Sequence, residues 1–209
     1  MLFSMYDPLH IRYARGELMV QSGTYAAGIA LIVSGIVQES YASDHDGDHE
    51  ATEILGPGDL IGFEVLLDGP HALHQTTARA LTSVRLAFLE RSTLQRALCE
   101  DSAIRNYVLM RLSTRVLSLK ASLARAHAPL GSRLLWLLLE LGKKSGQEIS
   151  GDRMTLPPEI DRRVIADLLD VSTRRLSRIW KDLVVCGKQG KTPQIALSRL
   201  RTGASGATE

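Results

Sequence analysis

The side chains with the clearest chemical character lie between Asp161 and Val185. Apolar residues recur there at helical spacing and predict one buried face, made of Leu176, Ile179, Trp180 and Leu183. The opposite face carries Thr173, Arg174, Ser177, Arg178 and Lys181. Cations and hydroxyls on one surface donate hydrogen bonds to phosphate oxygens and base edges. The chemistry this pattern predicts is binding rather than catalysis.

The residues before this helix supply what is needed to position it. Asp161 can cap a short helix that runs to Leu169, and Ser172 can cap the second helix after a three-residue turn. Ala166 is small enough to let two helices cross closely. The stretch therefore predicts a helix-turn-helix whose second helix reads DNA. The alternative is an ordinary solvated helix, but such a face usually mixes both charge signs, and Asp182 is the only acid here.

Two further segments, Arg153 to Leu156 and Gln194 to Leu197, can pair as a two-stranded wing. Between the second helix and the wing lies Gly187 to Lys191. The residues predicted to read bases are Thr173, Arg174, Ser177 and Arg178. The residues predicted to contact the DNA backbone are Ser172, Arg175, Lys181, Lys188 and Lys191.

Charge is segregated along the chain although the net charge is only +2. Residues 17 to 78 contain acidic side chains and no lysine or arginine. Residues 153 to 201 are predominantly basic. This division predicts two modules with different partners, and the rear module suits a polyanion.

Short apolar segments alternate with glycine-bearing turns in the front half, which predicts an antiparallel sandwich or barrel. The expected strands are Leu18 to Val20, Ile29 to Val33, Ile36 to Glu39, Thr52 to Leu55, Thr77 to Leu81 and Val84 to Leu89. The polar run Asp44 to Glu50 is best explained as a hairpin tip, with a metal loop as the alternative. The two cysteines exclude a disulfide framework and a four-cysteine iron–sulfur site.

Between Ser102 and Ala126 an apolar stripe follows spacings of three and four, as in a coiled coil. We expect a second copy of the chain to bury it, although packing on the chain's own fold is the alternative. The predicted dimer seam is Ile104, Val108, Leu112, Val116, Leu119 and Leu123. The following stretch, Gly131 to Leu141, is apolar all round and predicts a core helix.

The expected fold is therefore of the α+β class. Its parts are a β-roll sensor at 1–100, a dimerisation helix at 101–128, a winged helix-turn-helix at 129–201 and a flexible tail at 202–209. The chain lacks an apolar run long enough to cross a bilayer, so we expect a cytoplasmic protein without a membrane partner.

Several short motifs, taken together and in this order, resemble those of the CRP/FNR transcription regulators. They are Arg15-Gly16-Glu17 with Gly23, Ile32 to Val37, Gly56 to Gly62, and Ile165-Ala166-Asp167 leading to Val171-Ser172 and Leu176-Ser177-Arg178. The resemblance covers nearly the whole chain. It implies a cyclic-nucleotide-binding-like jelly roll, a homodimer on a palindromic double-stranded DNA site, and an effector in the roll. RNA polymerase is a further partner that it allows.

The sequence departs from the family where cyclic AMP would bind. Relatives that take this nucleotide hold its phosphate with an Arg-Ser pair, and the matching positions here are His74 and Gln75. Burying a phosphate among the carboxylates of residues 17 to 78 would be strongly unfavourable. We therefore predict that cyclic AMP does not bind tightly, and the effector, if one exists, stays open. The residues that would line an effector site are Gly62, Glu64, His74, Gln75 and Arg79.

Histidines allow two alternatives. His71 and His74 sit where heme-bearing relatives place an iron ligand, so a heme- or metal-dependent sensor of the same fold is one. The other is a cupin-like metalloenzyme with His45, His49, His71 and His74 as ligands, although these lie in two turn-rich segments rather than on neighbouring strands. Without such a site no metal is expected. An adaptor whose winged domain contacts protein is a third possibility.

The family resemblance also bears on the DNA sequence that is read. Relatives commonly carry a glutamate at the position of Arg174 and an arginine at that of Arg178. Arg178 matches, and a bidentate contact to guanine is its implied role. Arg174 does not match, so the half-site should differ from the common one. Asp170 replaces the usual turn glycine, and aspartate tolerates the left-handed conformation better than most residues.

Overall fold

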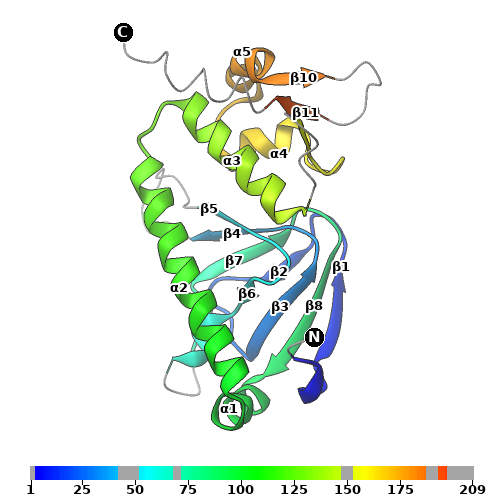
Figure 1. Ribbon diagram of the computed structural model, residues 1–209, viewed down its shortest axis with the longest axis vertical. Helices are drawn as coiled ribbons and strands as arrows, with labels where there is room; N and C mark the ends of the chain where they lie inside the picture. Colours follow the sequence, from blue (N-terminus) through cyan, green and yellow to red (C-terminus); the bar gives the residue numbers. More distant parts are fainter. Residues whose placement is uncertain (1–2, 42–51, 68–71, 147–152, 187–192, 197–209) are drawn as a thin grey trace. The chain divides into compact units, whose positions relative to one another are not determined.

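The computed structural model describes residues 3–41, 52–67, 72–146, 153–186 and 193–196 of the 209-residue chain (Figure 1). The chain divides into two compact units, Met1–Leu123 and Ala124–Glu209. Helix α2 (Ser102–Arg125) runs across this division, so nearly all of it belongs with the first unit. Among the described residues, no helix has the length and apolar content needed to span a bilayer.

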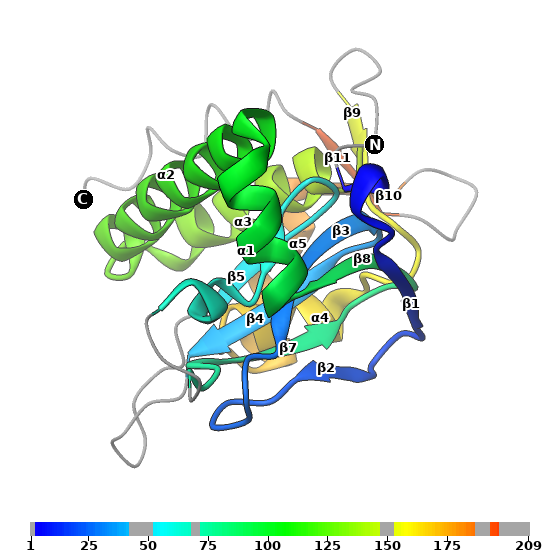
Figure 2. The ribbon, with the colours of Figure 1, turned by 90° about the horizontal axis from the view of Figure 1, so that it is seen from below.

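The first unit is a roll of two antiparallel four-stranded sheets, seen from a second side in Figure 2. One sheet has the order β1-β8-β3-β6 and the other the order β2-β7-β4-β5. The strands are β1 (Leu9–Tyr13), β2 (Leu18–Val20), β3 (Gly28–Ser34), β4 (Val37–Tyr41), β5 (Thr52–Leu55), β6 (Leu60–Ile61), β7 (Thr76–Ala80) and β8 (Val84–Glu90). This is the antiparallel roll that the glycine-punctuated sequence predicted.

All six predicted strands are present, and two of them, β2 and β5, have the predicted bounds. The prediction missed β1 and β6. Strand β1 alternates apolar and polar residues, as Leu-His-Ile-Arg-Tyr, and was therefore detectable, whereas β6 is only two residues long. The predicted hairpin tip at Asp46-Gly47 lies outside the described residues.

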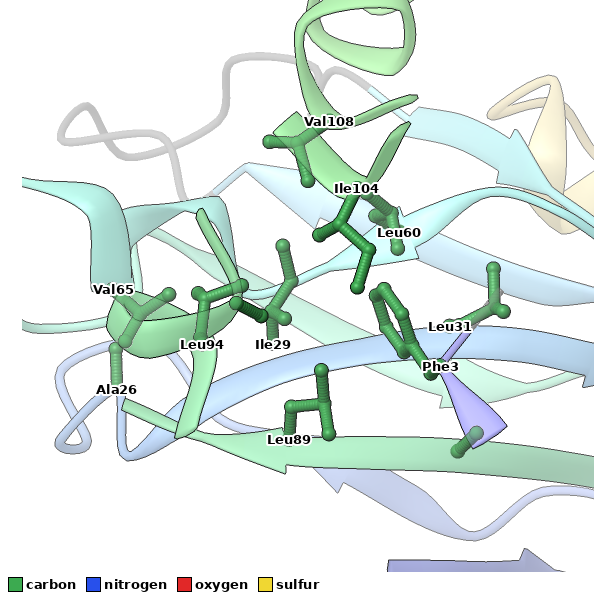
Figure 3. Close-up of a cluster of buried hydrophobic side chains, with 12 residues drawn as sticks. Phe3, Ala26, Ile29, Leu31, Leu60, Val65, Leu89, Leu94, Ile104 and Val108 are labelled. Atoms are coloured by element: carbon green, nitrogen blue, oxygen red, sulfur yellow. The ribbon is translucent and has the colours of Figure 1, made fainter. Parts of the chain in front are cut away.

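The interior of the roll holds two apolar clusters. One lies between the facing sheets and includes Val37, Leu55 and Ala80, which are neighbours across β4, β5 and β7. The other joins β3 and β8 to the helices and is drawn in Figure 3. Its helical members come from α1 (Arg91–Glu100), which the sequence prediction did not identify, and from the start of α2.

The first half of α2 packs on the roll itself, which corrects part of the predicted dimer seam. Ile104 and Val108 are buried beside Leu60 in the cluster of Figure 3, and Leu112 packs against the same cluster. These three side chains are covered by the chain's own fold. An apolar helical stripe indicates that the helix packs against something. Its periodicity is the same whether the packing partner is a sheet or a second helix.

The second unit contains three helices and a three-stranded sheet. The helices are α3 (Leu130–Lys144), α4 (Arg162–Leu168) and α5 (Thr173–Leu183), and the strands are β9 (Arg153–Thr155), β10 (Val184–Cys186) and β11 (Pro193–Ala196). The strand order is β10-β11-β9. The predicted pairing of the two wing segments is present as β9 and β11, and the prediction missed β10 as a third strand. The apolar α3 contributes Leu134, Leu138 and Leu141 to the core.

Candidate functional site

Helices α4 and α5 form the helix-turn-helix that the sequence predicted. Asp161 caps α4 by accepting hydrogen bonds from the backbone N–H groups of Arg163 at 2.8 Å and Val164 at 3.1 Å. Ser172 caps α5 through its hydroxyl oxygen, which accepts from the N–H of Arg175 at 3.2 Å. Each cap satisfies donors that the first helical turn leaves without an intrahelical partner.

The turn between the two helices is fixed by backbone contacts. Asp170 adopts the left-handed conformation with φ 50°, as its position in the turn predicted. The N–H of Val171 then donates to the carbonyl oxygen of Ala166 at 3.0 Å. Ala166 is a fully buried residue of α4. Arg133 of α3 donates to the carbonyl oxygen of Leu169 at 2.9 Å, so the end of α4 is tied to the core helix.

The exposed face of α5 is cationic. Leu176 and Trp180 are buried beneath it, and the side chains that the structure places in solvent are Thr173, Arg174, Arg175 and Arg178. Arg174 and Arg178 are one turn apart and so share a face, whereas Arg175 is rotated from Arg174 by about 100°. Such a face can present two guanidinium groups to base edges and a third to a phosphate.

The structure changes what Ser177 can do. Its hydroxyl donates to the carbonyl oxygen of Thr173 at 2.7 Å, so Ser177 can offer DNA only its acceptor lone pairs. Lys188 and Lys191 lie outside the described residues, and so does the side chain of Lys181. Their predicted contacts with the DNA backbone remain predictions.

Four of the five residues predicted to line an effector site do come together in the roll. The short helix η2 (Phe63–Leu66) carries Glu64, whose carboxylate lies 3.4 Å from Nδ1 of His74 and accepts a hydrogen bond from the N–H of Gln75 at 3.0 Å. Gly62 precedes this helix with φ 88°, and a Cβ there would stand 2.6 Å from the carbonyl oxygen of Gly28. Only glycine meets both conditions without strain.

Arg79 is not part of this group, which corrects the prediction. Along β7 buried and more exposed residues alternate, and Arg79 falls on the exposed side. Its guanidinium donates to the carbonyl oxygen of Gly16 at 2.8 Å. Proximity in sequence to His74 suggested the assignment, but the alternation of a strand sends the arginine to the other face.

The cation inside the roll is Arg115 of α2. Its guanidinium forms ion pairs with Glu39 and Glu53, the latter at 3.3 Å from Nε. It also donates to the hydroxyl oxygen of Tyr41 at 3.3 Å and to the carbonyl oxygen of Leu60 at 3.4 Å. The sequence prediction placed Arg115 on the flank of the dimer seam and did not assign it to a site.

The register of the second sheet explains why these groups meet. Glu39 of β4 stands directly opposite Glu53 of β5, and Tyr41 of β4 stands opposite Thr76 of β7. All four side chains share the face that holds Val37 and its apolar neighbours further along the strands. We call Glu39, Glu53, Tyr41 and Thr76 the polar layer. Both carboxylates are buried, with exposures of 2% for Glu39 and 6% for Glu53.

Hydrogen bonds and burial fix the protonation states in this layer. The hydroxyl of Thr76 donates to the carboxylate of Glu39 at 2.7 Å. Burial, followed by the charges of Glu53 and Glu64, raises the pKa of Tyr41 to about 12, so its phenol is neutral. Burial lowers the pKa of Arg115 to about 10, which leaves the guanidinium protonated at neutral pH.

The predicted histidine sites are only partly described. Within the described residues, no group of three or more histidine, cysteine, aspartate or glutamate side chains is arranged to hold a metal ion. His45, His49 and His71 lie outside those residues, and His74 faces Glu64.

Beyond its contacts with the roll, α2 carries an exposed apolar face. Leu109, Val116 and Leu123 follow one another at intervals of seven residues. Their exposed fractions are 56%, 48% and 75%. Met110 and Leu117 lie beside them and are exposed too. Val116 and Leu123 belong to the predicted seam. Leu109 was missed because the predicted stripe was counted from Ile104. Leu109 starts a neighbouring row of apolar residues that repeats with the same spacing.

Comparison with known proteins supports this picture of the two modules. Residues 10–101 match the cyclic nucleotide-binding domain family. The global nitrogen regulator of Synechococcus elongatus is 29% identical over 178 residues, which cover 84% of this chain and 79% of that protein.

Two solved structures illustrate the likeness in fold. The c-di-GMP-responsive global regulator CLP of Xanthomonas campestris superposes with a TM-score of 0.71 at 20% identity, covering 93% of this chain and 96% of that one. A CRP/FNR-family transcriptional regulator of Thermus thermophilus gives a TM-score of 0.69 at 17% identity, covering 93% of this chain and 97% of that one.

An antiparallel roll, a long helix and a helix-turn-helix define a class of two-module proteins in which one module carries the DNA-reading motif. The fold of this chain is that of the CRP/FNR transcription regulators, and residues 10–101 match the cyclic nucleotide-binding domain family. The resemblance predicted from the sequence motifs is thereby confirmed.

Proposed function

We propose that the chain is a sequence-specific DNA-binding transcription regulator of the CRP/FNR type that acts by binding rather than catalysis. The observation that carries the proposal is the exposed face of α5, which presents Arg174, Arg175 and Arg178. The opposite face of the same helix is buried through Leu176 and Trp180. Its relatives are transcription regulators. A protein of this function works where the DNA is, so we place it in the cytoplasm.

Each side chain of the interface has a distinct role in this proposal. Arg178 and Arg174 read base edges in the major groove, with Arg178 on a guanine. Thr173 and the acceptor side of Ser177 flank them. Arg175 and the backbone N–H groups at the Ser172 cap hold phosphates, because a helix N-terminus attracts anions. Lys181, Lys188 and Lys191 complete the phosphate contacts.

The functional unit is a homodimer on a palindromic site. The exposed apolar face of α2, defined by Leu109, Val116 and Leu123, supplies the seven-residue repeat of a two-stranded coiled coil. Two-fold symmetry then presents two recognition helices about 34 Å apart, one turn of B-DNA. Leu119 and Leu112 border this face. RNA polymerase is a further partner that a regulator of this type would contact.

The roll of this regulator does not depend on cyclic AMP. His74 and Gln75 stand at the positions where the phosphate would have to be held, and both contact the carboxylate of Glu64. A phosphate would be opposed by the carboxylates of the polar layer, which already share Arg115.

A binding-site selection tests the proposed function. The purified full-length chain is incubated with random duplexes at a stated salt concentration, and retained sequences are read after several rounds. The expected result is a palindrome whose half-sites are one helical turn apart and contain a guanine lost in the Arg178→Ala variant. Enrichment of no sequence would favour the adaptor in which the second unit contacts protein.

A further inference from the structure

The polar layer contains two like charges in direct opposition. Glu39 and Glu53 are cross-strand partners, and both are buried. Like charges in this position destabilise a sheet, and burial in a medium of low dielectric increases the cost. A cation bound beside the pair offsets this cost.

The two strands that carry the glutamates, β4 and β5, cannot supply that cation themselves. No lysine or arginine occurs from residue 17 to residue 78, the segment that forms β2 to β6 and most of β7. The cation that the structure places there is Arg115, which comes from α2. The guanidinium group of Arg115 is therefore bound by the roll as a ligand would be, although both belong to one chain.

The receptor atoms select for a guanidinium group. They are the two carboxylates, the carbonyl oxygen of Leu60 and the hydroxyl oxygen of Tyr41, and the ring of Phe63 lies 5.7 Å from the guanidinium carbon. Every polar atom in this set accepts, and they surround a planar fork of five N–H donors. An ammonium group offers three donors and no planar face, and an anion would meet like charge.

We propose that the polar layer, with Leu60 and Phe63, is a binding site for a guanidinium group. Arg115 is its resident ligand, and once Arg115 is removed the site accepts free small organic guanidinium cations. All residues of this site belong to the first unit, so the proposal does not depend on whether the chain binds DNA.

Chemical rescue tests this site. Arg115→Ala removes the resident ligand and leaves room for ethylguanidinium, which carries the same head group without the tether. The thermal unfolding midpoint of the full-length variant is measured against ethylguanidinium concentration. At ten times the dissociation constant we expect a rise of about 3–6 °C, from ligand linkage and the usual entropy of unfolding.

Three controls make the result specific. Ethylammonium has the charge without the fork and is expected to give no rise. The wild-type chain holds its own ligand at a high effective concentration, so no selective rise is expected at the concentration that half-saturates the variant. The double variant Glu39→Gln with Arg115→Ala should bind ethylguanidinium at least tenfold more weakly. Equal shifts with both cations, or the same shift in wild type, would overturn the proposal.

Two further measurements cover a variant that does not fold in plain buffer. In that case recovery of the far-ultraviolet strand signal with ethylguanidinium, and not with ethylammonium, supports the site, and no recovery with either cation overturns it. In a chain that keeps Arg115, Glu53→Gln should speed hydrogen exchange at the Arg115 Nε at least tenfold, because this atom lies 3.3 Å from the Glu53 carboxylate. Unchanged exchange would contradict the assignment of Arg115 as the bound group.

Discussion

Arg178 and Arg175 offer a direct test of the DNA interface because the structure gives them different roles. Both are exposed on α5, but they point to different sides of the helix. Arg178 shares its face with Arg174, in the proposed base-reading position. Arg175 lies beside the Ser172 cap, in the proposed phosphate-holding position. Removing each with alanine should therefore give two different signatures, although each change removes the same charge.

The loss at Arg178 follows from its hydrogen bonds. A bidentate arginine–guanine pair contributes about 1–3 kcal/mol of discrimination. A symmetric dimer loses two such pairs, about 2–6 kcal/mol in all, and because 1.4 kcal/mol is tenfold this lowers affinity by a factor of about 30 or more. The affinity for the matched site cannot fall below the affinity for non-specific DNA. Arg178→Ala should therefore bring matched and mismatched sites close together.

The loss at Arg175 follows from counterion release. Each phosphate contact contributes about 0.9 to the slope of log affinity against log salt, so Arg175→Ala in both subunits should flatten the slope by about 1.8. Affinity should fall by the same factor for every sequence. The ratio between matched and mismatched sites should remain that of the wild type.

Fluorescence anisotropy with a selected site and a one-base mismatch, at four salt concentrations, separates these signatures. Arg96→Ala is the matched control, since Arg96 is an exposed arginine of α1 and changes net charge equally. The reasoning would be refuted if Arg178→Ala flattened the salt dependence as Arg175→Ala does while preserving the preference for the matched site. An effect of Arg96→Ala of the same size would likewise remove the site assignment.

The remaining predictions concern the helices that position the interface. Ala166→Leu should destabilise the second unit by about 1–3 kcal/mol, because the added atoms have no space at the fully buried helix crossing; calorimetry checks this, with exposed Ala103→Leu as control. Asp161→Ala should cost about 1 kcal/mol through the lost cap, and Asp161→Asn should restore most of the unfolding midpoint. Val116→Glu should shift the chain to monomer in sedimentation, whereas Thr114→Glu, on the other side of α2, should leave a dimer. A dimer that survives Val116→Glu would place the interface elsewhere.

Local signals carried most of the fold. Glycine turns marked the strands because positive φ angles favour glycine, and Asp161 and Ser172 marked both helix starts because their oxygens accept backbone N–H groups. Helix α1 was missed although Leu94 and Ala97 are buried one turn apart. That short spacing was detectable, but ten residues hold too few turns to separate a helix from a strand end.

Non-local signals were harder to use. The sequence showed an acidic front half without cations, and the cation that balances it arrives from Arg115, far along the chain. Nothing in the spacing of Glu39 and Glu53 shows that they face each other, since register depends on the pairing of strands. The same limit explains why we expected a second copy to bury the whole α2 stripe. The error at Arg79 has another cause, because the alternation along β7 places this residue on the exposed side. Sequence periodicity gives the face of an element but not its neighbour.

The opposed glutamates also bear on how the molecule can be divided in the laboratory and during synthesis. A fragment that stops at residue 100 would contain every strand of the roll and both buried acids, but not Arg115, whose guanidinium pairs with them. The compact unit extends to Leu123 and so includes Arg115. In the full chain the cation that pairs with these acids comes from a helix that follows every strand of the roll in sequence, so the polar layer is complete only after α2 has been synthesised.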